Sequence, residues 1–289
     1  MLGAADIARK AVLPAIATSR NGRLVALASR IPERAHDILS AYPGVEVSPS
    51  YEALLGRADV DAVYIPLPNG LHREWTVRAL DAGKHVLCEK PLAVSAGEAE
   101  EMAAAAQRTG LLLMEAFMYR FHPVMREFVE GLREVLHVHA MFGFTMRDEQ
   151  DIRLDAALGG GALLDVGCYT ISVSRWILGE PVAVFARASA GHGVDMSVTA
   201  LLAFPRGETA TVWASFEAPE AQGLTVIARD GVHQRAMPFS AWRDPHDPYQ
   251  LMVESFADSI LLGRPVEIPL TESIANMRVL DRIRAAISS

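Results

Sequence analysis

Two separate stretches of the chain carry side chains that could oxidise an alcohol. Glu89-Lys90-Pro91 directly follows a short apolar run, and the proline restrains the lysine towards an extended backbone. Asp165 and Tyr169 follow a run of three glycines at 159–161. If residues 161–178 form a helix, these two side chains lie four residues apart and share one face. A lysine, a carboxylate and a phenol together suit proton transfer to or from a substrate hydroxyl.

Each of these groups also has a plainer interpretation. A lysine in a loop is usually solvated, Asp165 could complement the helix dipole, and Tyr169 could be a core aromatic. Gly167 costs the helix about 1 kcal/mol relative to alanine, which indicates that another part of the chain packs closely there. Residue spacing alone leaves both interpretations open.

A dinucleotide-binding turn is indicated at the very start of the chain. The segment from Gly3 to Ala8 matches the pattern G-x-G-x-x-G/A, with Ala5 and Ala8 at its second and third positions. In this pattern the first glycine permits a tight turn, and the helix N-terminus that follows binds a pyrophosphate. Ala5 adds a methyl group where backbone and phosphate approach, so a simple helix start explains the segment equally well.

Little sequence precedes this turn. Only Met1 and Leu2 come before Gly3, whereas the first strand of such a fold spans about five residues. Because that strand lies in the middle of the sheet, its loss would leave two neighbours unpaired. We therefore expect the given start to be truncated relative to the functional protein, and the intact mass of natively expressed protein would test this.

The residues after the second strand bear on the choice of cofactor. An acid there would bind the ribose 2′-hydroxyl of NAD, but the chain has Ser29-Arg30, and its first acid is Glu33. A hydroxyl and a guanidinium suit a 2′-phosphate, which arginine binds through charge-assisted bidentate hydrogen bonds. The pattern favours NADP over NAD, and a solvated surface arginine is the alternative.

These side chains need a scaffold of strands and helices. Up to about residue 114, short apolar runs alternate with helical patterns, which predicts parallel βαβ units. Beyond a helix near 123–132, longer stretches alternate apolar with polar residues, as in an antiparallel sheet with one covered face. We expect an α/β fold, with a Rossmann domain over 1–118 whose first strand is truncated, and an α+β domain over 119–289 with an open, mainly antiparallel sheet.

Composition and charge exclude several classes of function. The net charge of −8, with charges interspersed along the chain, argues against a nucleic-acid surface. No apolar stretch approaches the roughly 20 residues that cross a bilayer, and no signal peptide is evident, so we expect a cytoplasmic protein without a membrane partner. His233 and His246 lack partners at metal-ligand spacing, so no metal site is expected.

The order of the motifs resembles one known family. The Gly3–Ala8 turn, the 66–69 segment with His72, Glu89-Lys90-Pro91, and the 115–123 and 159–169 segments stand in the order seen in the Gfo/Idh/MocA oxidoreductases. The match covers nearly the whole chain. It looks like the branch of NADP-dependent sugar (xylose-type) dehydrogenases and trans-1,2-dihydrobenzene-1,2-diol dehydrogenases, because Tyr169 stands where inositol dehydrogenase relatives have histidine.

The resemblance implies roles for individual residues. Lys90 would be the catalytic lysine near the nicotinamide, and Asp165 and Tyr169 would face the substrate from the second domain. The residues that would line the cofactor are Gly3, Ala5, Ile7, Ser29, Arg30, Pro68, Asn69, His72, Glu89, Lys90 and Arg120. Arg153 could reach the cofactor or the substrate, and a surface salt bridge explains it equally well.

Chemical reasoning adds the path of the proton. Tyrosine has a pKa near 10, too high for an efficient base at neutral pH, but a neighbouring lysine ammonium lowers it. We expect Tyr169 to be the acid/base, Lys90 its electrostatic partner, and Asp165 the group that orients Lys90 or a substrate hydroxyl. In an alternative assignment Lys90 itself is the proton donor.

The sequence therefore predicts an NADP-dependent oxidoreductase. It would transfer a hydride between the nicotinamide and a hydroxyl or carbonyl carbon of a sugar, polyol or cyclic diol. The resemblance also implies a homodimer that pairs through the C-terminal sheet. The competing hypothesis is an NADP-binding redox sensor or decayed paralogue without turnover, which the short first strand favours and the retained Lys90, Asp165 and Tyr169 disfavour.

Overall fold

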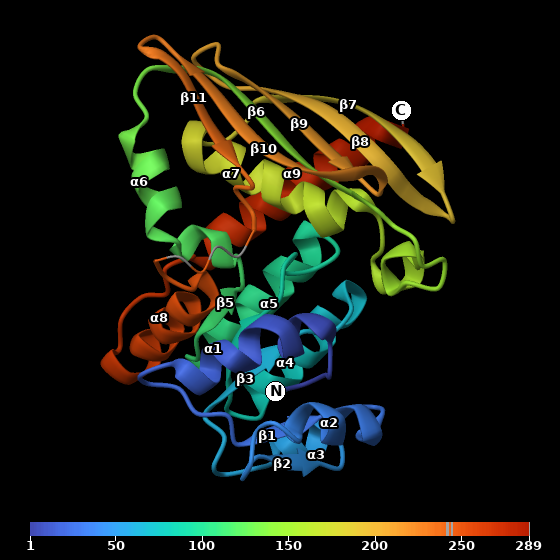
Figure 1. Cartoon of the computed structure of the whole chain (residues 1–289), viewed down its shortest axis with the longest axis vertical. Helices are drawn as coiled ribbons and strands as arrows, with labels where there is room; N and C mark the ends of the chain where they lie inside the picture. The colour runs from blue at the N-terminus through green and yellow to red at the C-terminus, as the bar shows by residue number, and fades with distance from the viewer. Residues whose placement is uncertain (241–242, 244, 289) are drawn as a thin grey trace. The chain divides into compact units, whose positions relative to one another are not determined.

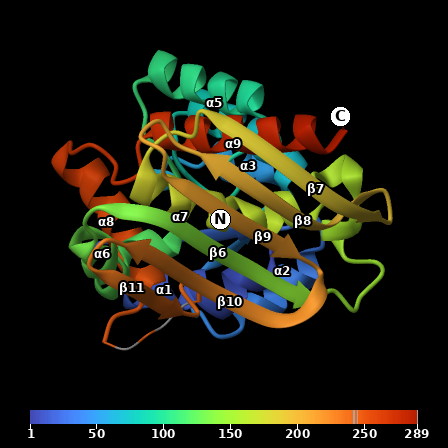
Figure 2. The ribbon, with the colours of Figure 1, turned by 90° about the horizontal axis from the view of Figure 1, so that it is seen from above.

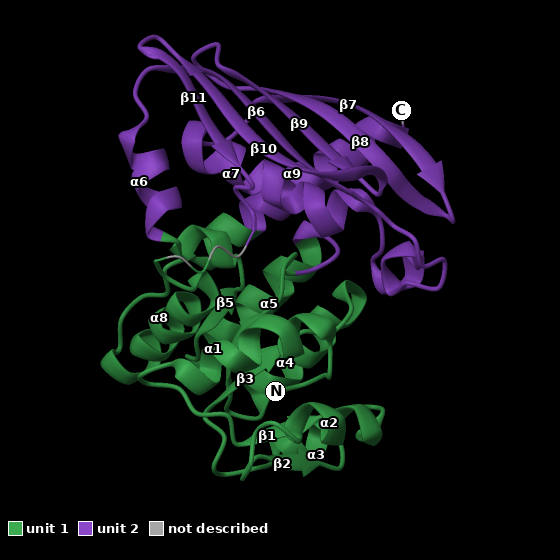
Figure 3. Ribbon diagram, in the orientation of Figure 1, with its two compact units in different colours: residues 1–92, 97–122, 241–273 green, residues 93–96, 123–240, 274–289 purple. Residues whose placement is uncertain are grey.

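The computed structural model describes residues 1–240, 243 and 245–288, and its chain divides into two compact units (Figure 3). The first unit comprises Met1–Leu92, Gly97–His122 and Ala241–Ser273. The second comprises Ala93–Ala96, Pro123–Ser240 and Ile274–Ser289. The sequence also predicts a boundary at residue 118 between a cofactor-binding and a substrate-binding domain, and this boundary stays a prediction.

Short parallel strands form the centre of the first unit (Figure 1). One sheet has the order β3-β4-β5, with β3 at Ala62–Ile65, β4 at His85–Cys88 and β5 at Leu113–Glu115. A second, parallel pair joins β1 (Ala26–Ala28) to β2 (Glu46–Ser48). Nearly all of β3, β4 and β5 is buried, as expected for parallel strands that helices cover on both faces.

Leu2 connects these two groups of strands. It forms a parallel bridge with Ala28 of β1, and its N–H donates to the carbonyl of Tyr64 in β3 at 3.0 Å. The N–H of Gly3 donates to the carbonyl of Ala28 at 2.8 Å. Leu2 therefore bonds to both strands that would flank the first strand of a Rossmann sheet.

Helices alternate with these strands along the chain. The first helical stretch begins with a π turn, η1 (Ala8–Val12), and continues as α1 (Leu13–Thr18). Pro14 accounts for the irregular turn, because proline lacks the N–H that would bond four residues back. The other helical elements of this unit are α2 (Pro32–Leu39), α3 (Tyr51–Leu55), η2 (Asn69–Leu71), α4 (His72–Asp81), α5 (Ala96–Thr109), η3 (Met118–Phe121) and α8 (Pro248–Leu262).

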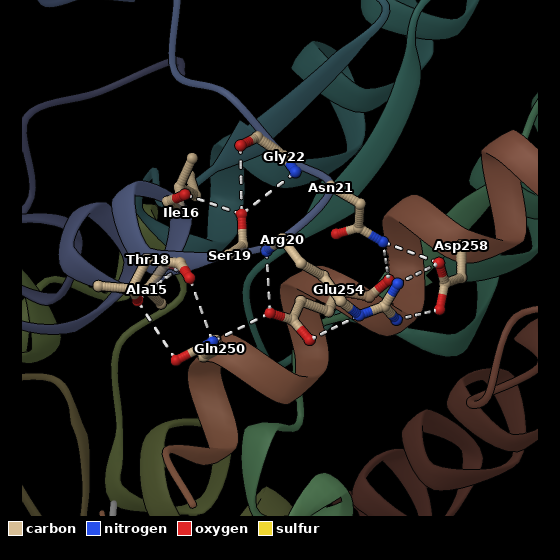
Figure 4. A network of polar contacts seen from close by, with 10 residues as sticks. All are labelled: Ala15, Ile16, Thr18, Ser19, Arg20, Asn21, Gly22, Gln250, Glu254 and Asp258. Atoms are coloured by element: carbon tan, nitrogen blue, oxygen red, sulfur yellow. Dashed lines mark hydrogen bonds and ion pairs between the residues drawn. The ribbon is translucent and has the colours of Figure 1, made fainter.

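Helix α8 lies far along the sequence but packs against the start of the first unit. Figure 4 shows the polar network that holds it there. Asn21 donates to the backbone carbonyl of Glu254 at 3.0 Å and to Asp258 Oδ1 at 2.8 Å. Arg20 forms ion pairs with both of these acids, and Gln250 donates to the carbonyl of Thr18 at 3.2 Å. The segment 241–273 thus belongs with the first unit, although it follows most of the second in sequence.

The second unit is built on one six-stranded sheet in the order β11-β10-β6-β9-β8-β7. Its strands are β6 (Val135–Thr145), β7 (Ala183–Gly191), β8 (Val194–Ala203), β9 (Thr209–Ser215), β10 (Glu217–Ala228) and β11 (Gly231–Ala236). The β6–β9 pair is parallel and the other pairs are antiparallel. Helices α7 (Cys168–Leu178) and α9 (Leu270–Ser288) lie behind the sheet in Figure 2, and α6 spans Pro123–Gly131.

The expected fold class is confirmed, with a parallel α/β first unit and an open, mainly antiparallel second sheet. A tight turn joins β7 to β8, where His192 and Gly193 have φ of 53° and 81°, as in a type I′ hairpin. Strands β2 and β11 and helix α3 were not expected, because each is short and weakly periodic.

One helical stretch corrects the expectation that no apolar segment of the chain is long enough to cross a membrane. Ala156–Leu178 is long and apolar enough to cross a membrane by length and composition, although no such stretch was expected. Within the protein, 67% of its most apolar window is buried. This burial is typical of a core helix, which packs against other parts of its own chain.

Candidate active site

Lys90 lies at the carboxyl end of β4, where ligands bind in open α/β sheets. It is half-buried, and the peptide bond from Lys90 to Pro91 is cis. Its own N–H lies 3.3 Å from Glu89 Oε2, to which it donates. The lysine therefore leaves the sheet from a backbone that its neighbours hold in place.

The neighbouring carboxylate of Glu89 is nearly buried, at 8% exposure. It accepts a hydrogen bond from the hydroxyl of Tyr64 at 2.5 Å. Burial raises the pKa of Tyr64 well above its ordinary value, and the charge of Glu89 raises it further, so the phenol stays a neutral donor. Sequence reasoning missed Tyr64, although a polar side chain at the end of a buried strand is a usable signal.

A second buried carboxylate supports the other side of the Lys90 loop. Glu115, the last residue of β5, is 1% exposed and accepts the N–H of Leu92 at 2.8 Å. Sequence reasoning named this acid only as part of a motif and gave it no role. Its position at the carboxyl end of a buried strand was again the available signal.

His72, the first residue of α4, is fully buried beneath two loops. Its Nδ1 lies 2.9 Å from the carbonyl oxygen of Pro91, and its Nε2 lies 2.8 Å from that of Leu67. Burial lowers the pKa of His72, while these two carbonyl groups oppose that shift. The structure therefore places His72 behind the loops that carry Pro68 and Lys90.

Gly3 adopts a backbone conformation that favours glycine. Its φ is +113°, and a Cβ atom there would lie 3.0 Å from Leu67 Cδ2. Ala5 and Ile7 follow at the start of the helical stretch, both partly exposed. This turn and the helix start that follows fit the close approach of a phosphate to backbone N–H groups.

Ser29 and Arg30 come directly after β1, at the edge expected to bind the adenosine end of a dinucleotide. Arg30 is exposed, and Ser29 Oγ accepts the N–H of Ile31 at 3.1 Å. Burial raises the pKa of the nearby Tyr51, and the positive charge of Arg30 counteracts part of this shift. A guanidinium at this edge can pair with a 2′-phosphate.

Pro68, Asn69 and Arg120 are three further residues predicted to line the cofactor. Pro68 and Asn69 are half-buried, and Asn69 begins the η2 turn. Arg120 lies in η3, with Nη1 3.7 Å from a carboxylate oxygen of Glu272. These residues belong to the first unit, as do Gly3, Arg30 and Lys90.

Asp165 and Tyr169 lie in the second unit, on a helix that begins irregularly. A π turn, η6 (Leu163–Gly167), leads into α7. The sequence predicted a regular helix over 161–178, and this prediction is wrong for the first turn, which is a π turn. Such π turns are frequent at functional sites. The close packing expected at Gly167 is confirmed, because a Cβ there would lie 3.3 Å from Ala214 Cβ.

The carboxylate of Asp165 faces a guanidinium of its own unit. Arg153 Nη1 lies 3.7 Å from Asp165 Oδ2. Asp151 accepts from Arg153 Nε at 2.9 Å and from Nη2 at 2.8 Å, and this pairing lowers the pKa of Asp151. The guanidinium also lies over the ring of Phe144, 5.3 Å from its centroid. Arg153 thus links two carboxylates, and the cofactor contact expected of it stays a prediction.

Aromatic rings surround Tyr169. Its ring centroid lies 5.6 Å from that of Phe142 and 5.4 Å from that of Phe239, and these two phenylalanines stack on one another. Tyr169 is 7% exposed. Its ring is therefore held in an apolar setting by tilted contacts with two aromatic neighbours.

A third acid, which sequence reasoning missed, holds the start of this helix. Asp195 of β8 accepts the N–H of Leu163 at 2.6 Å. Gly161 has φ of +110°, and a Cβ there would lie 2.3 Å from Asp195 Oδ1. Gly161 is thus explained by the close approach of this carboxylate, whose pKa burial raises.

Each unit by itself holds chemical groups that alcohol oxidation can use. The first has a fixed lysine and a phosphate-compatible turn, and the second has a phenol with a nearby carboxylate–guanidinium pair. In the described ranges, no group of three or more His, Cys, Asp or Glu side chains is placed to hold a metal ion.

Comparisons with known proteins match both halves of the chain. A family model described as an oxidoreductase family with an NAD-binding Rossmann fold, GFO_IDH_MocA, matches residues 1–117. A second model, described as the GFO/IDH/MocA C-terminal domain, matches residues 130–233.

Individual relatives cover most of the chain. D-xylose 1-dehydrogenase (NADP(+)) 2 of Haloferax volcanii is 38% identical over 309 residues, which span 98% of this chain and 95% of that protein. A trans-1,2-dihydrobenzene-1,2-diol dehydrogenase of Xenopus tropicalis is 31% identical over 80% of this chain and 70% of its own. The crystal structure of an aldose-aldose oxidoreductase from Caulobacter crescentus, complexed with glycerol, has a TM-score of 0.92 at 28% identity, over 99% of this chain and 96% of that one.

Proposed function

We propose that this chain, which belongs to the GFO/IDH/MocA family of oxidoreductases, is an NADP-dependent dehydrogenase. It transfers a hydride between the nicotinamide and a hydroxyl or carbonyl carbon of a sugar, polyol or cyclic diol. The observation that carries the proposal is Lys90, held at the carboxyl end of β4 by a backbone that the buried Glu89 and Glu115 support. The printed activities of the relatives agree with this substrate class.

Two observations support NADP as the cofactor. The Haloferax volcanii relative is named for NADP(+). In this chain, Ser29 and the exposed Arg30 stand where NAD enzymes place an acid against the ribose 2′-hydroxyl. The residues that would hold the dinucleotide are the Gly3–Ile7 turn, Ser29, Arg30, Pro68, Asn69, Glu89, Lys90 and Arg120, and we add His72 and Arg153 only as expectations from the sequence.

The cofactor, when bound, supplies the hydride acceptor, and the chain supplies the acid/base chemistry. As the hydride leaves the carbinol carbon, Tyr169 takes the hydroxyl proton and Lys90 stabilises the negative charge on the oxygen. Asp165 orients a substrate hydroxyl, with Arg153 holding its carboxylate in place. In the reverse direction Tyr169 returns the proton to the new alcohol.

The two domains would then have separate roles. Residues 1–118 form the cofactor-binding domain, and residues 119–289 form the domain that binds substrate. We place the enzyme in the cytoplasm, and we place a homodimer contact on the second sheet. Phe185 and Leu201 pair across β7 and β8, with 64% and 39% of their surface exposed.

A titration followed by a substrate panel tests the proposal. NADPH fluorescence reports binding, and absorbance of the reduced cofactor reports turnover with aldoses, polyols and a cyclic diol. We expect tight binding of NADPH, turnover of at least one substrate, and a loss of kcat of roughly 10²–10⁴-fold in Tyr169→Phe. Binding of NADPH without turnover of any substrate would favour a redox sensor, and near-wild-type turnover in Tyr169→Phe would remove the acid/base role.

A further inference from the structure

The imidazole of His72 joins the two loops that the proposed function needs most. One loop follows β3 and carries Pro68 and Asn69, and the other follows β4 and carries Lys90. The ring reaches the carbonyl of Leu67 in the first loop at 2.8 Å and the carbonyl of Pro91 in the second at 2.9 Å. Because His72 has no exposed surface, these contacts are shielded from competition with water.

The peptide unit between Pro91 and Leu92 is held at both of its ends. His72 Nδ1 contacts its carbonyl oxygen at 2.9 Å, and Glu115 accepts its N–H at 2.8 Å. The proline ring also fixes φ at Pro91. The backbone that immediately follows Lys90 therefore has little freedom, and buried side chains from α4 and β5 determine its direction.

The second contact of the ring acts on the other loop in the same way. The carbonyl of Leu67 lies one residue before Pro68, whose φ of −55° and ψ of 145° lead into the η2 turn. In that turn, the N–H of Leu71 donates to the carbonyl of Pro68 at 2.8 Å. A fixed carbonyl at Leu67 thus determines the position of Asn69, where the η2 turn begins.

We propose that His72 is a positioning residue with two separable effects. Its Nδ1 contact sets the Lys90 loop and thereby the rate of the chemical step. Its Nε2 contact sets the Pro68-Asn69 loop and thereby the binding of the cofactor. The kinetic part of this inference rests on the proposed function, whereas the effect on the two loops does not.

Two substitutions separate the contacts. The amide nitrogen of asparagine stands close to the position of Nδ1, so His72→Asn can donate to the carbonyl of Pro91 but does not reach that of Leu67. The amide nitrogen of glutamine reaches the position of Nε2, so His72→Gln can donate to the carbonyl of Leu67 but does not reach that of Pro91. A residue with only a general packing role would respond to both changes in the same way.

Amide hydrogen exchange measures the local stability of the two loops and does not require enzyme turnover. His72→Gln should speed exchange at the N–H of Leu92, and His72→Asn should speed it at the N–H of Leu71, because each loses the neighbouring contact. In kinetics, His72→Gln should lower kcat about tenfold with an unchanged KM for NADP⁺, since small displacements of a catalytic group are costly. His72→Asn should raise that KM and leave kcat unchanged.

His85→Gln is the matched control. His85 begins β4 in the same unit, and its Nδ1 accepts the N–H of Leu112 at 2.9 Å, so it contacts neither loop. This variant should leave kcat, KM and exchange at both loops as in the wild type. Equal changes at both loops in the two His72 variants, or none in either, would overturn the inference. If the wild type shows no NADP-linked turnover, the proposed function fails while the exchange pattern still decides the role of His72.

Discussion

At the scale of single residues, the support of Lys90 depends on buried hydrogen bonds to charged groups. Tyr64 donates to Glu89 at 2.5 Å, and both side chains are nearly buried. A buried carboxylate that loses one of its donors keeps the desolvation cost that this hydrogen bond offset, about 1–3 kcal/mol. Because Glu89 is next to Lys90, loss of this hydrogen bond would destabilise the proposed active site.

We therefore predict that Tyr64→Phe lowers the free energy of unfolding by about 1–3 kcal/mol. Urea denaturation followed by circular dichroism would measure the change. Tyr42→Phe serves as the control, because Tyr42 is half-buried and its hydroxyl forms no hydrogen bond within the described part of the chain. Equal midpoints for Tyr64→Phe and the wild type would show that Glu89 finds another donor.

Arg30 carries the predicted preference for NADP over NAD. A hydrogen bond to a charged group contributes about 1.5–3 kcal/mol, which corresponds to roughly tenfold or more in affinity. Arg30→Ala should therefore raise the KM for NADP⁺ by about tenfold and leave the KM for NAD⁺ unchanged. Arg34→Ala, an exposed arginine on the following helix α2, should change neither. A parallel loss for both cofactors in Arg30→Ala would contradict a 2′-phosphate contact.

At the scale of elements, the helix that bears Asp165 and Tyr169 is fitted closely to the sheet. Its π turn packs in a core cluster with Leu154, Val194 and Phe216. At Gly167, a Cβ atom would lie 3.1 Å from Leu163 Cδ1 and 3.3 Å from Ala214 Cβ. The leucine end can move, but the Cβ of Ala214 is attached directly to the backbone of β9.

Gly167→Ala should therefore lower the melting temperature, even though alanine favours a helix by about 1 kcal/mol. Overpacking of this kind costs about 1–3 kcal/mol. Gly131→Ala is the matched control at the end of α6, where a Cβ would meet no atom within 4 Å, and it should not destabilise the protein. Thermal unfolding of both variants provides the test, and a higher melting temperature for Gly167→Ala would contradict the close approach to β9.

Long elements with a clear hydrophobic period could be predicted from the sequence. Strand β4 at His85–Cys88 and helix α8 at Pro248–Leu262 are of this kind, because apolar spacing determines both. Strand β2 has three residues and one buried side chain, so its pairing with β1 depends on tertiary contacts that local sequence does not encode. The π turn at Leu163–Gly167 was missed for a similar reason, since Asp195 from a distant strand holds its start.

The candidate site was predictable to the same extent. Lys90 could be located because it directly follows an apolar strand. The support that surrounds it could not, because His72 and Glu115 reach it from other elements through buried contacts. Likewise, Arg153 is two residues from Asp151 in sequence, but its approach to Asp165 exists only once the loop has folded.

At the scale of the whole molecule, the proposed homodimer makes a testable claim about the second sheet. If Leu201 is buried in a contact between two copies, a charge there must be desolvated at a cost that weakens association. Leu201→Glu should therefore shift the protein towards monomer in sedimentation velocity. Leu261→Glu, on α8 of the first unit and 65% exposed, should leave the oligomeric state unchanged. A monomeric wild type would contradict the proposed assembly.

The central claim is that hydride passes between a sugar carbon and NADP with the help of Lys90. The most direct measurement uses an aldose deuterated at its carbinol carbons, oxidised NADP and mass spectrometry of the reduced cofactor. We predict that the wild type transfers deuterium to NADP, while Lys90→Met, an uncharged side chain of similar length, transfers it at a far lower rate. Reduced cofactor without deuterium, or full activity in Lys90→Met, would contradict the account.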